Sequence, residues 1–231
     1  MTDRYRISVI IPVFDRALRL LDEAIESALV QTRPPDEIIV VDDGSVEPVA
    51  PHLAATYRDA VMAVRQDNAG IGPARNLGLD HATGDLVTFL DSDDVWLPDK
   101  TEVQLAALEA DAELEAVYGQ AEQFYDDETD DEYRARHPIM RTVIESWTTV
   151  AVLMRRSALD RIGPFAAQSQ SVDIDWQARA RSVDVRSVML DRVVYRRRLH
   201  NSNMGLTRSD EGNPALLKAL RDHLHRQRGG A

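Results

Sequence analysis

Short apolar runs alternate with stretches of helical periodicity along the first 110 residues of the chain. Residues 7–14 (ISVIIPVF) are β-branched and almost continuously apolar, which is typical of a strand buried on both faces of a parallel sheet. From Arg16 to Gln31 the apolar residues recur at helical spacing, and Pro34 ends that helix. The alternation continues with expected strands at 38–41, 61–65 and 86–90, a modest helix to about Tyr57, and helices near 74–84 and 98–110. This order predicts a mainly parallel α/β sheet built from right-handed crossovers.

The pattern is less regular after residue 110. We expect strands at 116–124, 148–154 and 185–199, a short helix capped by Ser157 that ends at Ile162, a helix that begins near Asp173, and an amphipathic helix over about 214–228. Residues 126–137 (DDETDDEYRARH) are highly charged and lack apolar periodicity, so we interpret them as a mobile surface loop. No repeat or linker divides the chain. The prediction is therefore one doubly wound domain with helices on both faces of the sheet.

Polar and acidic residues follow three of the expected strands. Asp42 and Asp43 follow the strand at 38–41, a loop at 66–72 follows the strand at 61–65, and the sequence DSDD follows at 91–94. In doubly wound sheets ligands bind outside the carboxyl ends of the strands, so these three loops are expected to converge. Clustered carboxylates repel one another unless a cation neutralises them, and Mg²⁺ or Mn²⁺ commonly binds such oxygens together with substrate phosphates. A solvated acidic turn that leads into the next helix is the alternative interpretation.

Composition narrows the classes of function. The formal net charge of −12 disfavours nonspecific binding to nucleic acid or to an anionic membrane. An anionic substrate would therefore need a metal ion or a few well-placed arginines. The chain has no cysteine, which excludes disulfides and thiolate zinc sites. Because no apolar stretch is long enough to span a bilayer, we expect a cytoplasmic protein without a transmembrane anchor.

Five motifs occur in order along the chain: SVIIPVFDR, VVDDGS, NAGIGPARNLG, FLDSDD followed by WLPDK, and SVDIDW. Together they resemble the family 2 glycosyltransferases, which have the GT-A fold, over roughly residues 6–205. The resemblance implies a GT-A domain at 1–205, with a donor-binding part at about 6–100 and an acceptor-side part at about 101–205, followed by a C-terminal helix and tail at 206–231.

The resemblance also implies a reaction. A sugar would move from a UDP-, dTDP- or GDP-linked donor to an acceptor nucleophile, usually with inversion. The acceptor would be a small molecule, a glycan, a lipid-linked sugar or a peptide, and the oligomeric state stays open. The chain lacks the Gln-x-x-Arg-Trp motif of processive polysaccharide synthases, which favours transfer of a single sugar.

Matching motif positions give the expected site residues. Nucleotide-sugar contacts are expected from Pro12, Val13, Asp42, Asp43, Asn68, Arg75, Ser92 and Arg198. Asp43 would hydrogen-bond the base, and Arg75 would supply positive charge toward the diphosphate. Asp91, Asp93 and His200 are the expected ligands of a divalent cofactor, Mn²⁺ or Mg²⁺. His200 belongs to RRRLHNSN, which resembles the family's Arg-x-His-x-x-Asn ending and includes Asn203.

The expected catalytic base is Asp173. The family places an acidic pair, usually Glu-Asp, at the start of a helix and uses its second member to deprotonate the acceptor. Here the pair is Val172-Asp173, so the first carboxylate is missing. Asp175 is a rival for the role, and a helix N-cap would explain Asp173 without catalysis.

Three rival functions use similar features. A sugar nucleotidyltransferase also binds Mg²⁺ through carboxylates on an α/β sheet, but it needs a glycine-rich basic loop after the first strand, where this chain has FDRALRL. A noncatalytic nucleotide-sugar-binding protein of the same fold is the second rival, motivated by Val172. The third is a phosphoacceptor receiver domain, against which the length and the later motifs argue.

Overall fold

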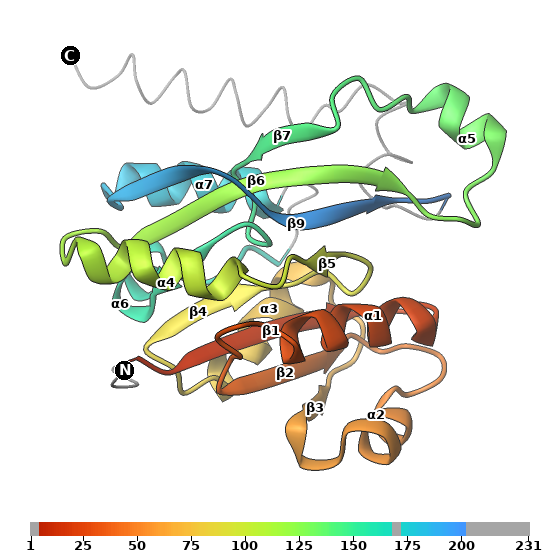
Figure 1. Ribbon diagram of the computed structural model, residues 1–231. Coiled ribbons are helices and arrows are strands. Elements are labelled where there is room, and N and C mark those ends of the chain that lie inside the picture. Colours follow the sequence, from red (N-terminus) through yellow and green to blue (C-terminus); the bar gives the residue numbers. More distant parts are fainter. Residues whose placement is uncertain (1–4, 168–171, 202–231) are drawn as a thin grey trace.

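One mixed β-sheet runs through the computed structural model, which describes residues 5–167 and 172–201 (Figure 1). The strands occur in the spatial order β3-β2-β1-β4-β8-β6-β9-β5, and β7 pairs with β6. The strands are β1 Ile7–Val13, β2 Glu37–Asp42, β3 Met62–Arg65, β4 Leu86–Phe89, β5 Val95–Trp96, β6 Ala116–Tyr125, β7 Val143–Ser146, β8 Leu153–Arg155 and β9 Ser187–Leu199. The helices are α1 Leu18–Leu29, α2 Ala50–Tyr57, α3 Ile71–His81, α4 Lys100–Ala110, α5 Asp131–Arg136, α6 Arg156–Ile162 and α7 Val172–Ser182, with a 3₁₀ turn, η1, at Arg58–Ala60.

The first half of the sheet is parallel, as the sequence predicts. β1 pairs in parallel with β2 and β4, and β2 pairs in parallel with β3. All seven residues of β1 are buried, because α1 lies in front of the sheet and α3 behind it in the view of Figure 1. Gly78 allows α3 to approach closely, since a Cβ there would lie 2.4 Å from Cγ2 of Ile10. The predicted α/β class with helices on both faces is confirmed.

The second half of the sheet joins the first through antiparallel pairing. β8 lies between β4 and β6 and pairs antiparallel with both strands. β6 then pairs in parallel with the long strand β9, which confirms the strand expected at 185–199. The two-residue strand β5 has no detectable periodicity and was not predicted. Its pairing of Val95 with Arg196 brings the end of β9 beside the segment 91–94.

The prediction of a mobile loop at 126–137 is wrong. Residues 131–136 form helix α5, and the N-cap Asp130 accepts a hydrogen bond of 2.6 Å from the backbone N of Tyr133. Asp126 and Tyr133 are each only 3% exposed. A six-residue helix held by one cap and one buried ring is too short to show apolar periodicity, so the charged composition dominated the sequence pattern.

Two further boundaries differ from the prediction. The strand expected at 148–154 is a turn followed by β8, because the buried apolar residues 150–152 lie in that turn and only their continuation is a strand. Ser157 does not cap α6, since the N-cap position is Arg155 and makes no side-chain capping bond. The predicted end of α6 is confirmed at Gly163, which has a φ of 80°.

Some predictions lie outside the described residues, namely the helix over about 214–228 and the role of Asn203. Among the helices in residues 5–167 and 172–201, none combines the length and apolar character that crossing a bilayer requires.

Candidate active site

The carboxyl ends of β1, β2 and β4 lie at one edge of the sheet. Val13 is opposite Asp42 in the parallel register, and the backbone N of Asp43 donates a 2.8 Å hydrogen bond to the carbonyl of Val13. Leu90, just after β4, donates a 3.0 Å hydrogen bond to the carbonyl of Ile10. Pro12 and Val13 are buried between these strands. The expected convergence of the strand-end loops is therefore confirmed.

Asp42 stabilises the turn that follows β2. Its Oδ1 accepts a hydrogen bond of 2.8 Å from the backbone N of Ser45, and its Oδ2 accepts one of 3.3 Å from Val49 and another from Arg65. Burial acts to raise the pKa of Asp42, but these hydrogen bonds outweigh burial and lower it. The side chain is 3% exposed. This geometry gives Asp42 a structural role and does not support the predicted nucleotide contact.

Asp43 holds the loop that follows β3. Its Oδ1 accepts hydrogen bonds of 2.7 Å from Gln66 Nε2 and 2.9 Å from the backbone N of Ala69, and its Oδ2 accepts one of 2.9 Å from Gly70. Asn68, within the same loop, is exposed. Asp43 thereby places Asn68 at the edge of the site. The contacts of Asp43 and Asn68 with a donor remain predictions.

Asp91 begins the acidic segment after β4, and its side chain is 35% exposed. Its Oδ1 accepts a 3.1 Å hydrogen bond from Nη2 of Arg75. Burial raises the pKa of Asp91 against the opposing charge of Arg75, and the neighbouring carboxylates of Asp93 and Asp173 add to the rise. The next residue, Ser92, is buried. A partly exposed carboxylate with a raised pKa is the kind of group that a divalent cation would stabilise in its charged form.

Asp94 is the third carboxylate of this segment and has a different role. It is 5% exposed, and its Oδ1 accepts a 2.8 Å hydrogen bond from the backbone N of Arg198. Burial and the charges of Asp93 and Asp91 raise the pKa of Asp94 well above its usual value. Asp94 therefore links the acidic segment to the end of β9.

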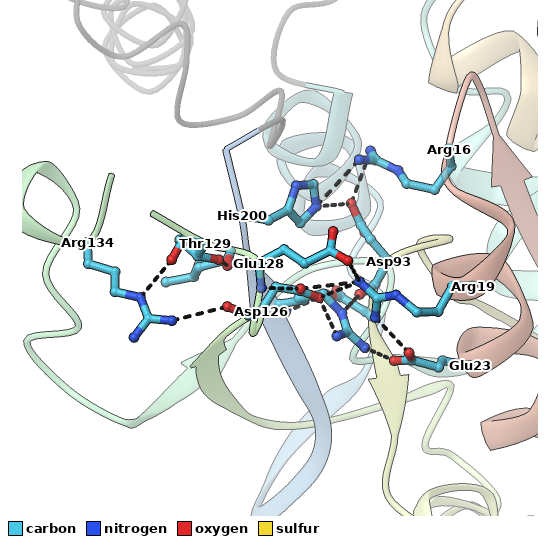
Figure 2. Close-up of polar contacts among 12 residues, drawn as sticks. Arg16, Arg19, Glu23, Asp93, Asp126, Glu128, Thr129, Arg134 and His200 are labelled. Atoms are coloured by element: carbon cyan, nitrogen blue, oxygen red, sulfur yellow. Dashed lines mark hydrogen bonds and ion pairs between the residues drawn. The ribbon is translucent and has the colours of Figure 1, made fainter. Parts of the chain in front are cut away.

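Asp93 lies within a cluster with His200 and Arg16 (Figure 2). Its Oδ2 is 3.0 Å from Nε2 of His200 and 3.1 Å from Nη2 of Arg16. Burial acts to raise the pKa of Asp93, but the hydrogen bond with His200 and the charge of Arg16 outweigh burial and lower it. The structure therefore brings together two of the expected metal ligands, Asp93 and His200, although they are far apart in the sequence.

The side chain of Arg198 is buried and paired with carboxylates from two other segments. Its side chain is 6% exposed, and its Nη1 donates a 2.7 Å hydrogen bond to the buried carboxylate of Asp126. It also pairs with Glu23 and donates a 2.8 Å hydrogen bond from Nε to the carbonyl of Asp93. Asp126 additionally accepts a 3.2 Å hydrogen bond from Arg19 of α1 (Figure 2). The predicted contact of Arg198 with the nucleotide sugar has no support in this geometry.

From the sequence we expect Arg75 to extend toward an open diphosphate site. In the structure its side chain is buried instead. It is 0% exposed, and its two terminal nitrogens bind carboxylates from different elements. Nη1 donates a 3.0 Å hydrogen bond to Oδ1 of Asp173, and Nη2 donates the 3.1 Å bond to Asp91. Oδ1 of Asp173 also accepts a 2.8 Å hydrogen bond from the hydroxyl of Thr149. The expected base and the expected metal ligand are therefore joined by one guanidinium.

The two rival bases on α7 have different surroundings. Asp175 pairs with Arg179 one turn further along the helix, at 3.1 Å between Oδ2 and Nε. Asp173 instead contacts residues of α3 and of the turn before β8. Val172, where the family usually has Glu, is 8% exposed and belongs to the hydrophobic core. These contacts favour Asp173 over Asp175 as the reactive carboxylate.

The residues at the acidic segment have the right chemistry for a hard divalent ion. Asp91 and Asp93 offer carboxylate oxygens and His200 offers an imidazole nitrogen, which are ligands that Mn²⁺ and Mg²⁺ accept. Within residues 5–167 and 172–201, no three acidic or histidine side chains are already arranged around one ion position. Such ions usually complete their coordination with substrate phosphates and water, so the donor set fits an ion that binds together with a diphosphate.

Sequence reasoning missed three residues of this region: Arg16, Thr149 and Asp126. Arg16 and Thr149 contact the expected metal ligand and the expected base, respectively, while Asp126 pairs with Arg198. Arg16 lies three residues after the end of β1, so its position near the carboxyl edge of the sheet could have been inferred from the sequence. Thr149 and Asp126 lie in segments whose structure was predicted wrongly, and nothing in the sequence marked them.

Solved structures identify the class of fold. S. aureus TarS 1–349 in complex with UDP-GlcNAc aligns with a TM-score of 0.67 at 19% sequence identity, covering 87% of this chain and 60% of that one. The same region of TarS in complex with UDP aligns with a TM-score of 0.63 at 20% identity, covering 84% of this chain and 60% of that one. The protein therefore has the GT-A fold.

Sequence comparison identifies the family. The family described as Glycosyl transferase family 2 matches residues 8–176, and the chain belongs to this family. The succinoglycan biosynthesis protein ExoW of Rhizobium meliloti (strain 1021) is 41% identical over 99 residues, which are 41% of this chain and 31% of ExoW. An uncharacterized glycosyltransferase of Rickettsia felis is 41% identical over 105 residues, which are 45% of this chain and 17% of that protein. The match thus covers less than a third of the length of these relatives.

Proposed function

We propose that the protein is a glycosyltransferase that moves a single sugar from a nucleoside diphosphate sugar to an acceptor nucleophile. One observation carries this proposal: Arg75 bonds both Asp91 and Asp173, at 3.1 and 3.0 Å, so the expected base lies beside the expected metal site. Membership of glycosyl transferase family 2 supplies the reaction class. The juxtaposition supports a site in which a donor diphosphate and an acceptor meet.

We propose a uridine nucleotide as the first donor to test. TarS, which shares the fold, has been solved with UDP-GlcNAc and with UDP. The strand-end loops at Val13, Asp43 and Asn68 supply backbone groups and polar side chains at the edge where nucleotides bind in such sheets. dTDP- and GDP-sugars remain in the panel, because 19% identity to TarS transfers the fold and not the donor.

A divalent ion belongs to this proposal. Asp91, Asp93 and His200 would hold Mn²⁺ or Mg²⁺, which would offset the negative charge that builds on the leaving diphosphate. The net charge of −12 makes such compensation necessary for an anionic substrate. Arg16 adds a fixed positive charge at the same place, 3.1 Å from Asp93.

The proposed chemistry is a single displacement with inversion. Oδ1 of Asp173 is occupied by Arg75 and Thr149, whereas no residue of the described chain bonds Oδ2. Oδ2 would take the proton of the acceptor hydroxyl as the acceptor oxygen bonds to C1 of the sugar. The bond between C1 and the β-phosphate oxygen breaks, and its electron pair leaves with the nucleoside diphosphate. The side chain of Asp173 is 36% exposed, so an acceptor can approach it.

A noncatalytic nucleotide-sugar-binding protein is the second candidate. The observation that favours it is Val172, a buried apolar residue at the position where the family usually has a carboxylate beside the base. A third candidate, a sugar nucleotidyltransferase, is disfavoured because the chain leaves β1 through a segment without glycine and enters α1.

One experiment separates these candidates. The protein is incubated with Mn²⁺ and a panel of UDP-, dTDP- and GDP-sugars, and the released nucleoside diphosphate is measured. A transferase hydrolyses its donor slowly when water replaces the acceptor, whereas a binding protein shows nucleotide affinity in calorimetry without release. A parallel incubation with nucleoside triphosphates and a sugar phosphate tests the nucleotidyltransferase, which would release pyrophosphate.

A further inference from the structure

The guanidinium of Arg75 is placed between two carboxylates that the sequence separates widely. Asp91 and Asp173 lie 16 and 98 residues from Arg75, and each binds a different terminal nitrogen. Burying a charged group is unfavourable unless it is paired, and here both carboxylates supply the pairing. Burial acts to lower the pKa of Arg75, but Asp173 and Asp91 raise it, so the side chain stays charged. Because only 1% of the side chain is exposed, its remaining N–H groups do not face solvent.

Aromatic rings fix the position of this guanidinium. Its central carbon lies 5.8 Å from the ring centre of Phe89 and 5.5 Å from that of Phe165. The two rings meet edge to face, with centres 5.4 Å apart, and Phe165 stacks on Trp176 of α7. Such contacts with aromatic faces favour a cation, and they restrict the rotation of its side chain. Arg75 is therefore held rigidly in the direction of Asp173.

The segment before α7 is also attached to α3. The side chain of Asn76 donates a 2.9 Å hydrogen bond to the carbonyl of Phe165 and accepts one of 2.8 Å from its backbone N. Gly72 allows close contact, because a Cβ there would lie 2.4 Å from the carbonyl oxygen of Ala166. Helix α3 thus positions both the approach to α7 and the first turn of α7, which contains Asp173.

The hydrogen bonds of Asp173 fall on one oxygen. Arg75 and Thr149 both donate to Oδ1, at 3.0 and 2.8 Å. Two donors on Oδ1 fix the plane of the carboxylate and leave Oδ2 as the oxygen without a partner in the described chain. The side chain of Asp173 is 36% exposed and that of Arg75 only 1%, so the base is accessible to solvent while the guanidinium is not.

We propose that Arg75 is a positioning residue that orients the catalytic carboxylate of Asp173 relative to the metal-binding segment, and that it does not bind the donor diphosphate. This inference rests on the proposed function. It assigns to Arg75 an effect on turnover and not on donor affinity. One buried side chain then fixes the position of Asp173, on the acceptor side of the site, relative to Asp91, on the donor side.

The test uses Arg75→Lys in the full chain. A lysine has a single ammonium and cannot reproduce the two-armed fork that spans Asp91 and Asp173. With the panel sugar that the wild type hydrolyses fastest, kcat should fall about 10- to 100-fold, because small errors in geometry at a base have effects of this size. Calorimetric affinity for the matching nucleoside diphosphate with Mn²⁺ should change less than about threefold, since this binding does not depend on the base. A parallel loss of nucleotide affinity would overturn the proposal in favour of a diphosphate contact.

A double-mutant cycle distinguishes positioning from a general structural effect. In the Asp173→Asn background Arg75→Lys should lower the residual kcat by less than about threefold, because the group it orients is already inactive. A full 10- to 100-fold fall in that background would show that Arg75 does not act through Asp173. The matched control is Arg179→Lys. It alters the pair of Arg179 with Asp175 on α7, the helix that also carries Asp173, and should leave kcat within about twofold of the wild type.

Two further measurements keep the outcome decisive. If Arg75→Lys does not fold, as judged by circular dichroism, Thr149→Val removes the other donor to Oδ1 and should lower kcat several-fold at unchanged nucleotide affinity. Unchanged kcat in Thr149→Val would then overturn the proposal. If Asp173→Asn keeps full turnover, Asp173 is not the base and the positioning role is overturned, while the absence of nucleoside diphosphate release from every panel sugar in the wild type would overturn the proposed function itself. If Asp173→Asn is inactive but Arg75→Lys keeps full turnover, only the positioning role is overturned.

Discussion

His200 Nε2 lies 3.0 Å from Oδ2 of Asp93, although 107 residues separate them in the chain. The contact exists because β9 runs parallel to β6 and its end pairs with β5, which directly follows the acidic segment. The imidazole and a carboxylate of the expected metal site are therefore brought together by the topology of the second half of the sheet.

Removing the carboxylate of Asp93 should abolish the effect of metal on nucleotide binding. In calorimetry with UDP, dTDP and GDP, the wild type is expected to bind its nucleotide at least about tenfold more tightly with Mn²⁺ than with EDTA, because the ion offsets the repulsion between carboxylates and diphosphate. Asp93→Ala should remove this difference. Asp127→Ala, which removes an exposed carboxylate, is the control. Equal affinity with and without metal in the wild type would refute the metal role.

Under the proposed function, Asp173→Asn should abolish donor hydrolysis while nucleotide binding survives. Asparagine keeps the size of the side chain but lacks a basic oxygen, and general base catalysis typically contributes about 10²–10⁴-fold. We expect donor hydrolysis to fall at least about 100-fold, with nucleotide affinity nearly unchanged. Asp175→Asn should retain most activity, because Asp175 is paired with Arg179 and not with the site. An active Asp173→Asn together with an inactive Asp175→Asn would move the base by two residues.

Asp126→Ala should destabilise the fold. Asp126 and Arg198 are 3% and 6% exposed, and removal of one partner leaves a buried charge with weaker compensation. We expect the free energy of unfolding to fall by about 3 kcal/mol in urea titrations. The adjacent Asp127→Ala should change it by no more than about 0.5 kcal/mol. A similar small change in Asp126→Ala would mean that the segment 126–137 is not anchored through this pair.

Stability should fall in acid through Glu37, which lies at the opposite edge of the sheet from the site. Burial acts to raise its pKa, but hydrogen bonds from Ser8 and Thr83 and the charge of Arg6 outweigh burial and lower it from 4.5 to about 2. Because the pKa is lower in the folded state, this stabilisation is complete above about pH 4.5 and is lost as the pH falls toward 2. We expect about 2 kcal/mol in this window, less than the full shift implies, because solvent screens part of the charge.

Glu37→Gln is the direct check of that pH dependence. Urea unfolding of the wild type and of the variant between pH 5 and 2 should differ most at pH 5 and converge at low pH. The two curves would remain parallel if other carboxylates governed the acid response. Glu102→Gln, on the exposed surface of α4, is a matched control.

The sequence allowed the fold class and the place of the site to be predicted because local patterns specify both. Apolar runs marked β1, β2 and β4, and the topology of parallel sheets required their carboxyl ends to share an edge. The structure brings Asp91 and Asp173 to the same guanidinium, and their roles in the site remain predictions.

The roles of the arginines could not be predicted in the same way. Arg75 and Arg198 carry the same charge in the sequence whether they face a substrate or a buried carboxylate. Their partners, Asp173 and Asp126, are 98 and 72 residues away, and only tertiary packing determines these pairs. Helix α5 was not predicted for a related reason. It is held by the N-cap Asp130 and by burial of Tyr133, and it has no apolar periodicity that the sequence would show.

Because β9 is the last strand of the described sheet and pairs with β6, the residues of the candidate site are completed late during synthesis. Asp91 and Asp93 leave the ribosome long before Asp173 and His200. At about 5–20 residues per second, the 107 residues between Asp93 and His200 take about 5–20 s to synthesise. During that interval the nascent chain carries the acidic segment without its imidazole and Arg75 without the carboxylate of Asp173. The proposed site is therefore complete only after nearly two hundred residues have been made.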